Sequence, residues 1–133
     1  MNRLAKWGHW LVAAFLGARG LGLFHWLVID IPPAWHRLHA ATPPRGYVPA
    51  AIALCGFYFA CAWGILMWRK WAHVSAITLT LLELAIFGLA AAMVGWITPS
   101  ASNALWLGLN LAVFAWLVLP DVRTSYWQRQ QVA

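Results

Sequence analysis

Two ionisable side chains of opposite charge lie inside apolar stretches of this chain. Arg19 stands in FLGARGLGLF, and Glu83 stands in LTLLELAIFG. A charge in the middle of a membrane costs at least about 2.5–3.5 kcal/mol, and a partner of opposite charge at the same depth offsets much of that cost. Such residues could bind a proton, a cation or an anionic headgroup. They could equally hold two helices together.

Three uncharged polar side chains are expected in the same layer. At 1.5 Å per helical residue, Arg19 and Glu83 both lie roughly 18 Å from the tryptophan that opens their segments. The same arithmetic brings Tyr58, Thr80 and Asn110 close to that depth. We predict an Arg19–Glu83 ion pair in a buried polar centre, with Tyr58, Thr80 and Asn110 supplying further hydrogen bonds, because a partly satisfied buried network is costly.

Two histidines form a second candidate site. His9 and His73 occupy matching positions near the starts of two apolar segments, each two residues after a tryptophan. Neutral imidazole is a common metal ligand, so such a pair could hold haem b, or each histidine could ligate a bacteriochlorophyll-type pigment. The competing interpretation is a histidine at the membrane boundary, within reach of water. On that interpretation the chain carries no cofactor.

Catalytic and metal-binding patterns are weak elsewhere. His36 and His39 stand three apart in the loop DIPPAWHRLHAATPPRGYVP, near Asp30, but no firm third ligand accompanies them. An amphipathic turn on the membrane surface explains them better, and we expect no metal site. The chain has no Ser-His-Asp set, no paired carboxylates and no phosphate-binding loop. We therefore expect a protein that is not an enzyme.

The composition indicates how these residues are positioned. Of 133 residues, 63% are hydrophobic and 9% are charged, whereas soluble domains carry about 25% charged residues. Apolar stretches near the roughly 20 residues of a membrane-spanning helix recur along the chain. We predict an all-α fold, a four-helix transmembrane bundle, as a single integral membrane domain over residues 1–133. The expected spans are about 7–29, 49–68, 71–97 and 103–119.

The basic residues indicate an orientation. Six of them flank the spans on one side, and Arg37 and Arg45 lie on the other side. The six are Arg3, Lys6, Arg69, Lys70, Arg123 and Arg129. The positive-inside rule then places both termini in the cytoplasm, in a bacterial inner membrane. The net charge of +6 fits this topology and attraction to membrane lipid rather than nucleic acid, because no soluble basic module is present.

Tryptophans gather near the ends of the predicted spans, as in the aromatic belts of membrane proteins. Trp63 and Trp116 lie deeper. We expect these two to pack inside the bundle.

An internal similarity frames the two candidate sites. KWGHWLVAAF begins at Lys6 and KWAHVSAITL begins at Lys70. Ten residues after the histidine of each copy stands a charged residue, Arg19 in one and Glu83 in the other. We interpret this as a tandem repeat of two helical hairpins that share one orientation.

The second half of the chain resembles a group of small inner-membrane proteins of bacteria. The resemblance is carried by AWGILMWRKWAHVSAITLTLLELAIF and LWLGLNLAVFAWLVLPDVRTSYW, within residues 62–127. In those proteins a basic turn precedes the third of four helices, that helix contains an acidic residue, and the fourth ends in Pro-[Asp/Glu]-Val-Arg. The family has no assigned activity, so the resemblance implies a fold and a location rather than a reaction.

The expected function is that of a non-enzymatic accessory or structural subunit, acting through helix–helix contacts with itself or with a larger membrane complex. One alternative is a small channel or carrier component for a proton, cation or small solute, using Glu83 and Arg19. A second alternative is a haem- or chlorophyll-type pigment-binding subunit using His9 and His73.

Overall fold

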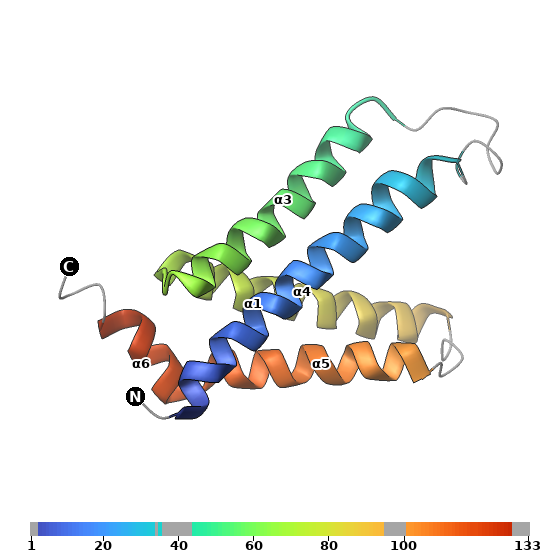
Figure 1. Cartoon of the computed structure of the whole chain (residues 1–133). Coiled ribbons are helices and arrows are strands. Elements are labelled where there is room, and N and C mark those ends of the chain that lie inside the picture. Colours follow the sequence, from blue (N-terminus) through green and yellow to red (C-terminus); the bar gives the residue numbers. More distant parts are fainter. Residues whose placement is uncertain (1–2, 34, 36–43, 95–100, 129–133) are drawn as a thin grey trace. The chain divides into compact units, whose positions relative to one another are not determined.

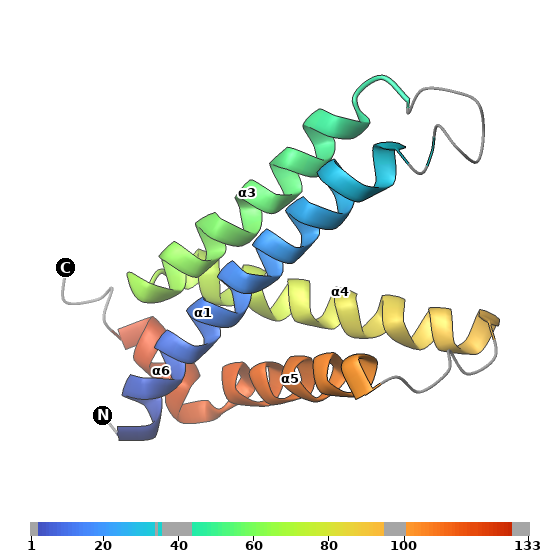
Figure 2. The same ribbon diagram turned by 45° about the vertical axis from the view of Figure 1, so that its right-hand side comes forward.

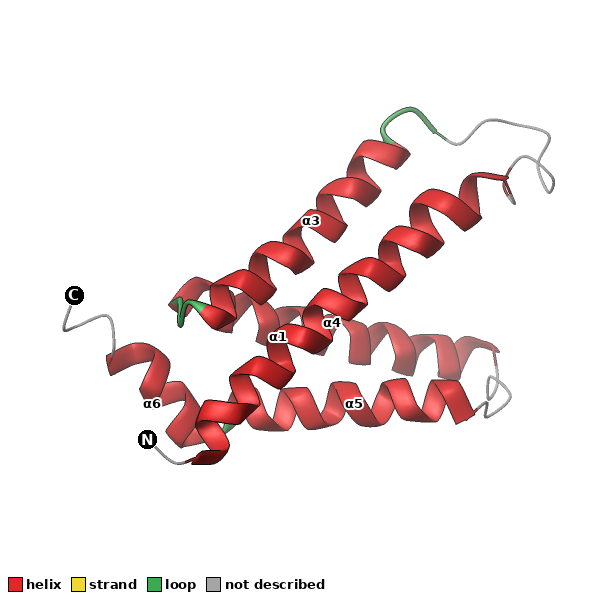
Figure 3. Ribbon diagram, in the orientation of Figure 1, coloured by secondary structure: helices red, strands yellow, loops and turns green. Residues whose placement is uncertain are grey.

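The computed structural model describes residues 3–33, 35, 44–94 and 101–128. Every regular element within these ranges is a helix (Figure 3). The all-α prediction is therefore confirmed for the part of the chain that the structure describes. The elements are α1 (Arg3–Phe24), η1 (His25–Asp30), α3 (Tyr47–Leu66), α4 (Lys70–Val94), α5 (Ala101–Val118) and α6 (Pro120–Gln128).

Three helical stretches are long and apolar enough to cross a membrane: Trp7–Pro33, Tyr47–Leu66 and Lys70–Leu89. A fourth passes the same test if Ala104–Val118 and Pro120–Gln128 form one span, although the two are bent by 57°. Large apolar side chains are also exposed on every long helix. Extended apolar surface suits lipid rather than water, so length, composition and surface all indicate a membrane protein.

The chain divides into two compact units. The N-terminal unit is His9–Met67, and the C-terminal unit is Met1–Gly8 together with Trp68–Ala133. Within the first, α1 and α3 lie side by side and run in opposite directions (Figures 1 and 2). Within the second, α4 and α5 do the same. Each unit is therefore built on one antiparallel pair of long helices.

The N-terminal unit is held by close packing of small residues. The buried residues of α3 recur every three or four positions: Ala51, Cys55, Tyr58, Cys61, Gly64 and Ile65. Opposite this stripe, a Cβ atom on Gly20 would lie 3.2 Å from Cβ of Tyr58 and 3.4 Å from the ring of Phe59. Glycine at this position lets the two helices approach closely. A hydrogen bond also joins α3 to η1, from the Tyr47 hydroxyl to the Leu27 carbonyl at 3.1 Å.

The first helix changes its winding before it ends. Residues His25–Asp30 form one turn of π-helix, in which hydrogen bonds connect residues five apart. The same spacing brings the exposed side chains of His25 and Asp30 together, with Nδ1 and Oδ2 3.0 Å apart. The predicted first span contained no such feature, because nothing in an apolar run distinguishes a π-turn from the α-helix around it.

The C-terminal unit is centred on α4. Its buried residues again follow helical spacing: Ala72, His73, Ala76, Leu79 and Thr80. The first turns of α1 also belong to this unit. A Cβ atom on Gly8 would overlap the indole of Trp116 in α5, so a glycine is required where that ring meets the helix backbone.

The fourth apolar segment does not end the helical structure. We predicted a span ending at Leu119, and α5 ends one residue earlier, at Val118. Pro120 then opens α6, with Asp121 in its first turn. Proline suits the first position of a helix, and an acidic side chain there favours the positive end of the helix dipole. The chain therefore continues past the proline as a second, bent helix that the sequence analysis did not predict.

The tryptophans are exposed at several positions expected for aromatic belts, such as Trp7, Trp10 and Trp71. Trp116 is half-buried, in keeping with its expected deeper position. Trp63, which we expected inside the bundle, is 63% exposed. That prediction is wrong, because depth along a helix says nothing about which face the residue occupies.

Candidate functional site

The five residues of the predicted polar centre fall in both units. Arg19 and Tyr58 belong to the N-terminal unit, and Thr80, Glu83 and Asn110 belong to the C-terminal unit. Tyr58, Thr80 and Asn110 are buried, while the two charged residues are half-buried. Arg19 and Glu83 therefore lie in different units, and the ion pair between them stays a prediction.

Two members of the predicted centre direct their donors into their own helices. The Thr80 hydroxyl lies 2.9 Å from the carbonyl of Ala76 and 3.0 Å from that of Ile77. The Asn110 amide donates to the carbonyl of Trp106 at 3.1 Å. A polar side chain in an apolar helix is commonly satisfied in this way. Among the described residues, Oδ1 of Asn110 has no hydrogen-bond partner and stays available as an acceptor.

The histidines share a helical stripe with the charged residues. On α4, His73 and Thr80 are buried, and Glu83 follows one turn later at the half-buried edge of the same stripe. On α1, His9 is buried and Arg19 occupies the corresponding edge. The spacing of ten residues therefore keeps histidine and charge on one broad face, along which the intervening residues at helical spacing are also buried.

His73 forms a hydrogen bond with the C-terminal end of α5. Its ring is 2% exposed, and Nε2 lies 2.9 Å from the backbone carbonyl oxygen of Leu117. Because a carbonyl can only accept, Nε2 carries the proton and donates it to this bond. The last carbonyls of a helix lack partners within it, and the bend before α6 leaves that of Leu117 to be satisfied by a side chain.

Two aromatic residues complete this arrangement. The ring of Tyr126, from α6, stacks on the His73 ring with centroids 4.7 Å apart and an interplanar angle of 27°. Trp68, between α3 and α4, also contacts Tyr126, with the two ring centroids 4.9 Å apart. We call Trp68, His73, Leu117 and Tyr126 the elbow cluster. It joins the turn before α4, α4 itself, the end of α5 and α6.

Burial governs the chemistry of the cluster. Tyr126 is fully buried, and loss of solvent raises the pKa of its hydroxyl above the ordinary range. Trp68 has a φ of 55°, a left-handed backbone conformation that costs a non-glycine residue roughly 1–2 kcal/mol. The contact between its ring and Tyr126 offsets this cost, since an aromatic pair contributes about 0.5–1.5 kcal/mol beyond the buried area.

The expectation that the histidines are reached by water is wrong. His9 is 6% exposed and His73 is 2% exposed. For His73 the physical reason is α6, which brings Tyr126 over the ring. The sequence held a signal for this helix: Pro120 and Asp121 mark its start, and Val122 and Tyr126, four residues apart, form its buried face. The predicted fourth span ends before Pro120, because a proline commonly ends a helix, so the sequence analysis contains no α6.

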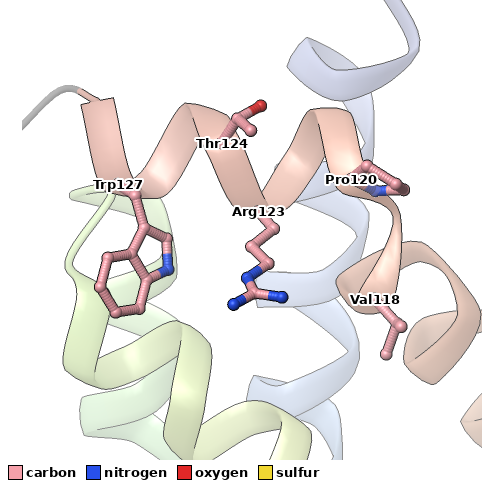
Figure 4. A pocket seen from close by; sticks show the side chains of 5 residues that line it. All are labelled: Val118, Pro120, Arg123, Thr124 and Trp127. Carbon is pink, nitrogen blue, oxygen red and sulfur yellow. The ribbon is translucent and has the colours of Figure 1, made fainter.

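A pocket opens on the other side of α6 (Figure 4). Its volume is about 410 Å³, and its walls are Val118, Pro120, Arg123, Thr124 and Trp127. The ammonium group of Lys70 lies over the Trp127 ring, 4.8 Å from its centroid. We call this space the elbow pocket. Its lining combines apolar side chains with one cation, Arg123.

The outer-loop candidates are only partly described. His36 and His39 lie outside the described residues, so the interpretation of that loop stays a prediction. His25 and Asp30 form an exposed pair. Within residues 3–33, 35, 44–94 and 101–128 there is no cluster of three or more histidine, cysteine or acidic side chains that could hold a metal ion.

Comparison with known proteins adds no relative. No family model, no curated protein and no solved structure matches this chain. Its function has to be argued from the contacts of its own residues.

Proposed function

We propose that this protein is a non-enzymatic accessory or structural subunit of a bacterial inner membrane, acting through helix–helix contacts with itself or with a larger membrane complex. The observation that carries the proposal is how the C-terminal unit uses its buried polar groups. His73, Thr80 and Asn110 all donate to backbone carbonyls. Polar groups committed in this way stabilise helices in lipid and fix their packing.

The outer faces of the helices support the same function. Large apolar side chains such as Leu11 and Leu21 on α1, and Ile86 and Leu89 on α4, are more than half exposed. These faces are open to lipid or to the helices of another chain. The direct test is affinity purification of the tagged protein from its native membranes in mild detergent. We expect a homo-oligomer or a defined complex with another membrane protein, and a monomer that retains no partner would contradict the proposal.

In this proposal Arg19 and Glu83 act as a clasp. Each lies on the half-buried edge of its helix's buried stripe, where an opposite charge can be reached. Arg19→Leu or Glu83→Leu should each destabilise by about 3–5 kcal/mol, because each leaves a charge uncompensated. The exchange of Arg19→Glu with Glu83→Arg should recover most of that loss. Thermal unfolding in detergent measures this, and single variants as stable as the parent would rule out the clasp.

The second candidate function is a small channel or carrier component for a proton, cation or small solute. The observation in its favour is Glu83 itself, a half-buried carboxylate far inside an apolar helix, since ionisable residues at such depth commonly mark a transport path. Flux into proteoliposomes distinguishes the two. A clasp predicts no flux in the parent, whereas a carrier predicts flux that Glu83→Gln abolishes without loss of stability.

The third candidate is a haem- or pigment-binding subunit using His9 and His73. The geometry of His73 argues against it, because the Nε2–H group donates to the Leu117 carbonyl and Tyr126 covers one face of the ring. Ligation through Nδ1 is the remaining route, and it would have to form beside that stack. An absorption spectrum of protein purified from native membranes tests this, and a Soret or red-region band lost in His73→Leu would revive the candidate.

We further propose that the two units are a tandem repeat of hairpins with both termini in the cytoplasm. Support comes from burial at equivalent positions. His9, Val12 and Leu16 are buried on α1, as His73, Ala76 and Thr80 are on α4, each 64 residues later. The second helices share an Ala-Trp pair followed by apolar residues, in AWGILMWRK and AWLVLPDVR. The repeat fades there, since Trp63 is exposed and Trp116 is half-buried. Labelling of single cysteines added at residues 2 and 128 tests the orientation, with Cys55 and Cys61 replaced.

A further inference from the structure

The two faces of α6 have different surroundings. Val122 and Tyr126 are buried, whereas Arg123 and Trp127, one residue further along, are exposed. Figure 4 shows the side chains of Arg123 and Trp127 extending from the same side of the helix, with the indole nitrogen on the edge facing Arg123. Residues four apart are neighbours on a helix. Two side chains that can donate hydrogen bonds therefore share one wall of the elbow pocket.

The pocket has an uncompensated positive charge. The guanidinium of Arg123 makes no ion pair with any carboxylate among the described residues. Lys70 contacts the ring of Trp127 but does not line the pocket. Thr124 lines the pocket without offering its hydroxyl proton to a ligand, because the hydroxyl donates to the Asp121 carbonyl at 3.1 Å. The pocket is thus suited to an anion.

The remaining walls select the kind of anion. Val118 and Pro120 give the pocket an apolar side, which a small hydrated ion would leave unused. A guanidinium binds phosphate through two parallel hydrogen bonds, and tryptophan and lysine are favoured at the membrane boundary. The pocket also stands where the apolar helix α5 gives way to the polar helix α6. A phosphate carrying an apolar chain matches each of these features.

We propose that the elbow pocket binds the phosphate headgroup of an anionic phospholipid. Arg123 binds the phosphate, the Trp127 N–H donates a further hydrogen bond to it, and Val118 and Pro120 contact the start of the acyl chains. This site does not depend on the function proposed above. A structural subunit and a carrier would use it alike.

The test is native mass spectrometry of the full-length protein, released from detergent micelles and titrated with phosphatidylglycerol or phosphatidylcholine of the same acyl chains. We expect preferential retention of phosphatidylglycerol. Arg123→Gln should weaken that retention about tenfold, the equivalent of one charged hydrogen-bonded contact. Arg123→Lys should weaken it about threefold, because a point charge replaces the planar fork. The matched control is Arg69→Gln, an exposed arginine outside the pocket, expected to change retention by less than about twofold.

Three results would overturn the proposal. The first is equal retention of the two lipids. The second is an equal loss in Arg69→Gln and Arg123→Gln, which would mean diffuse attraction to the basic surface. The third is displacement of phosphatidylglycerol by millimolar inorganic phosphate, which would make free phosphate the ligand. If Arg123→Gln does not fold, Arg123→Lys decides the question alone.

Discussion

The two units solve the same packing problem differently. The N-terminal unit joins two continuous helices by bringing backbones close together at Gly20 and Tyr58. The C-terminal unit contains a helix broken at Pro120, and it gathers His73, Tyr126 and Trp68 around the break. A continuous helix satisfies its own carbonyls and needs little beyond close contact. A broken helix exposes carbonyls that need a donor, and in the C-terminal unit His73 supplies one to Leu117.

The largest effect should come from removing the aromatic ring that closes the elbow cluster. Tyr126→Ala deletes a fully buried ring between His73 and Trp68, and we expect a loss of about 3–5 kcal/mol in unfolding free energy. Titration with a denaturing detergent, followed by helical circular dichroism, measures it. Tyr126→Phe keeps the ring and serves as the control. If Tyr126→Ala unfolds like the parent, α6 does not stabilise the C-terminal unit.

The next effect isolates the hydrogen bond. His73→Leu keeps much of the side-chain volume but leaves the Leu117 carbonyl without its donor, which should cost about 1–3 kcal/mol. His73→Gln offers an N–H at a similar reach and should recover part of the loss. The same unfolding titration applies. A Leu variant no less stable than the Gln variant would show that the bond is not the source of stability.

Alanine substitutions at two nearby glycines test the close packing of the N-terminal unit. We expect smaller changes in unfolding free energy here, of opposite sign at the two positions. Gly20→Ala places a methyl group 3.2 Å from Cβ of Tyr58, an atom fixed to the α3 backbone, and we expect destabilisation of about 1 kcal/mol. Nothing lies within 4 Å of the corresponding atom in Gly22→Ala. That variant should stabilise by about 0.5–1 kcal/mol through lower backbone entropy of the unfolded chain. Two variants of equal stability would count against the contact.

The smallest effect on unfolding free energy comes from the Tyr126 hydroxyl, and it appears only at alkaline pH. Burial raises its pKa, so above about pH 10 the unfolded chain loses this proton while the folded chain retains it. The stability contributed by the neutral phenol is complete below pH 10 and declines as pH rises beyond it. Unfolding titrations at pH 8 to 11 measure the slope. Tyr126→Phe should remove this part of the slope, and an unchanged slope would assign it to other groups.

Much of the fold follows from the sequence because lipid imposes strong rules. Apolar length alone predicts the long helices, since a backbone in lipid must satisfy its own hydrogen bonds. The α6 helix was missed because Pro120 is a stop signal for one helix and a start signal for the next. Thr80 and Asn110 are buried, but depth along a helix does not by itself predict this, because it does not fix the face that a residue occupies.

The contacts of the elbow cluster could not be predicted from the sequence, for a different reason. His73 was recognised as a candidate, but its partner is a main-chain carbonyl at Leu117, 44 residues away. A backbone carbonyl carries no residue-specific signal. Its availability depends on the bend angle between two helices, which is a property of the folded chain.

The position of α6 in the chain has a consequence for how the C-terminal unit is made. Synthesis produces α4 first, with His73 already within the apolar helix, and α6 follows after α5 is complete. Until α5 is complete the histidine lacks the Leu117 carbonyl, and until α6 forms it lacks the Tyr126 ring. An unpartnered imidazole in lipid is costly and exposed to other partners. Assembly of the membrane helices therefore has an interval in which α4 is vulnerable, and the arrival of α6 ends it.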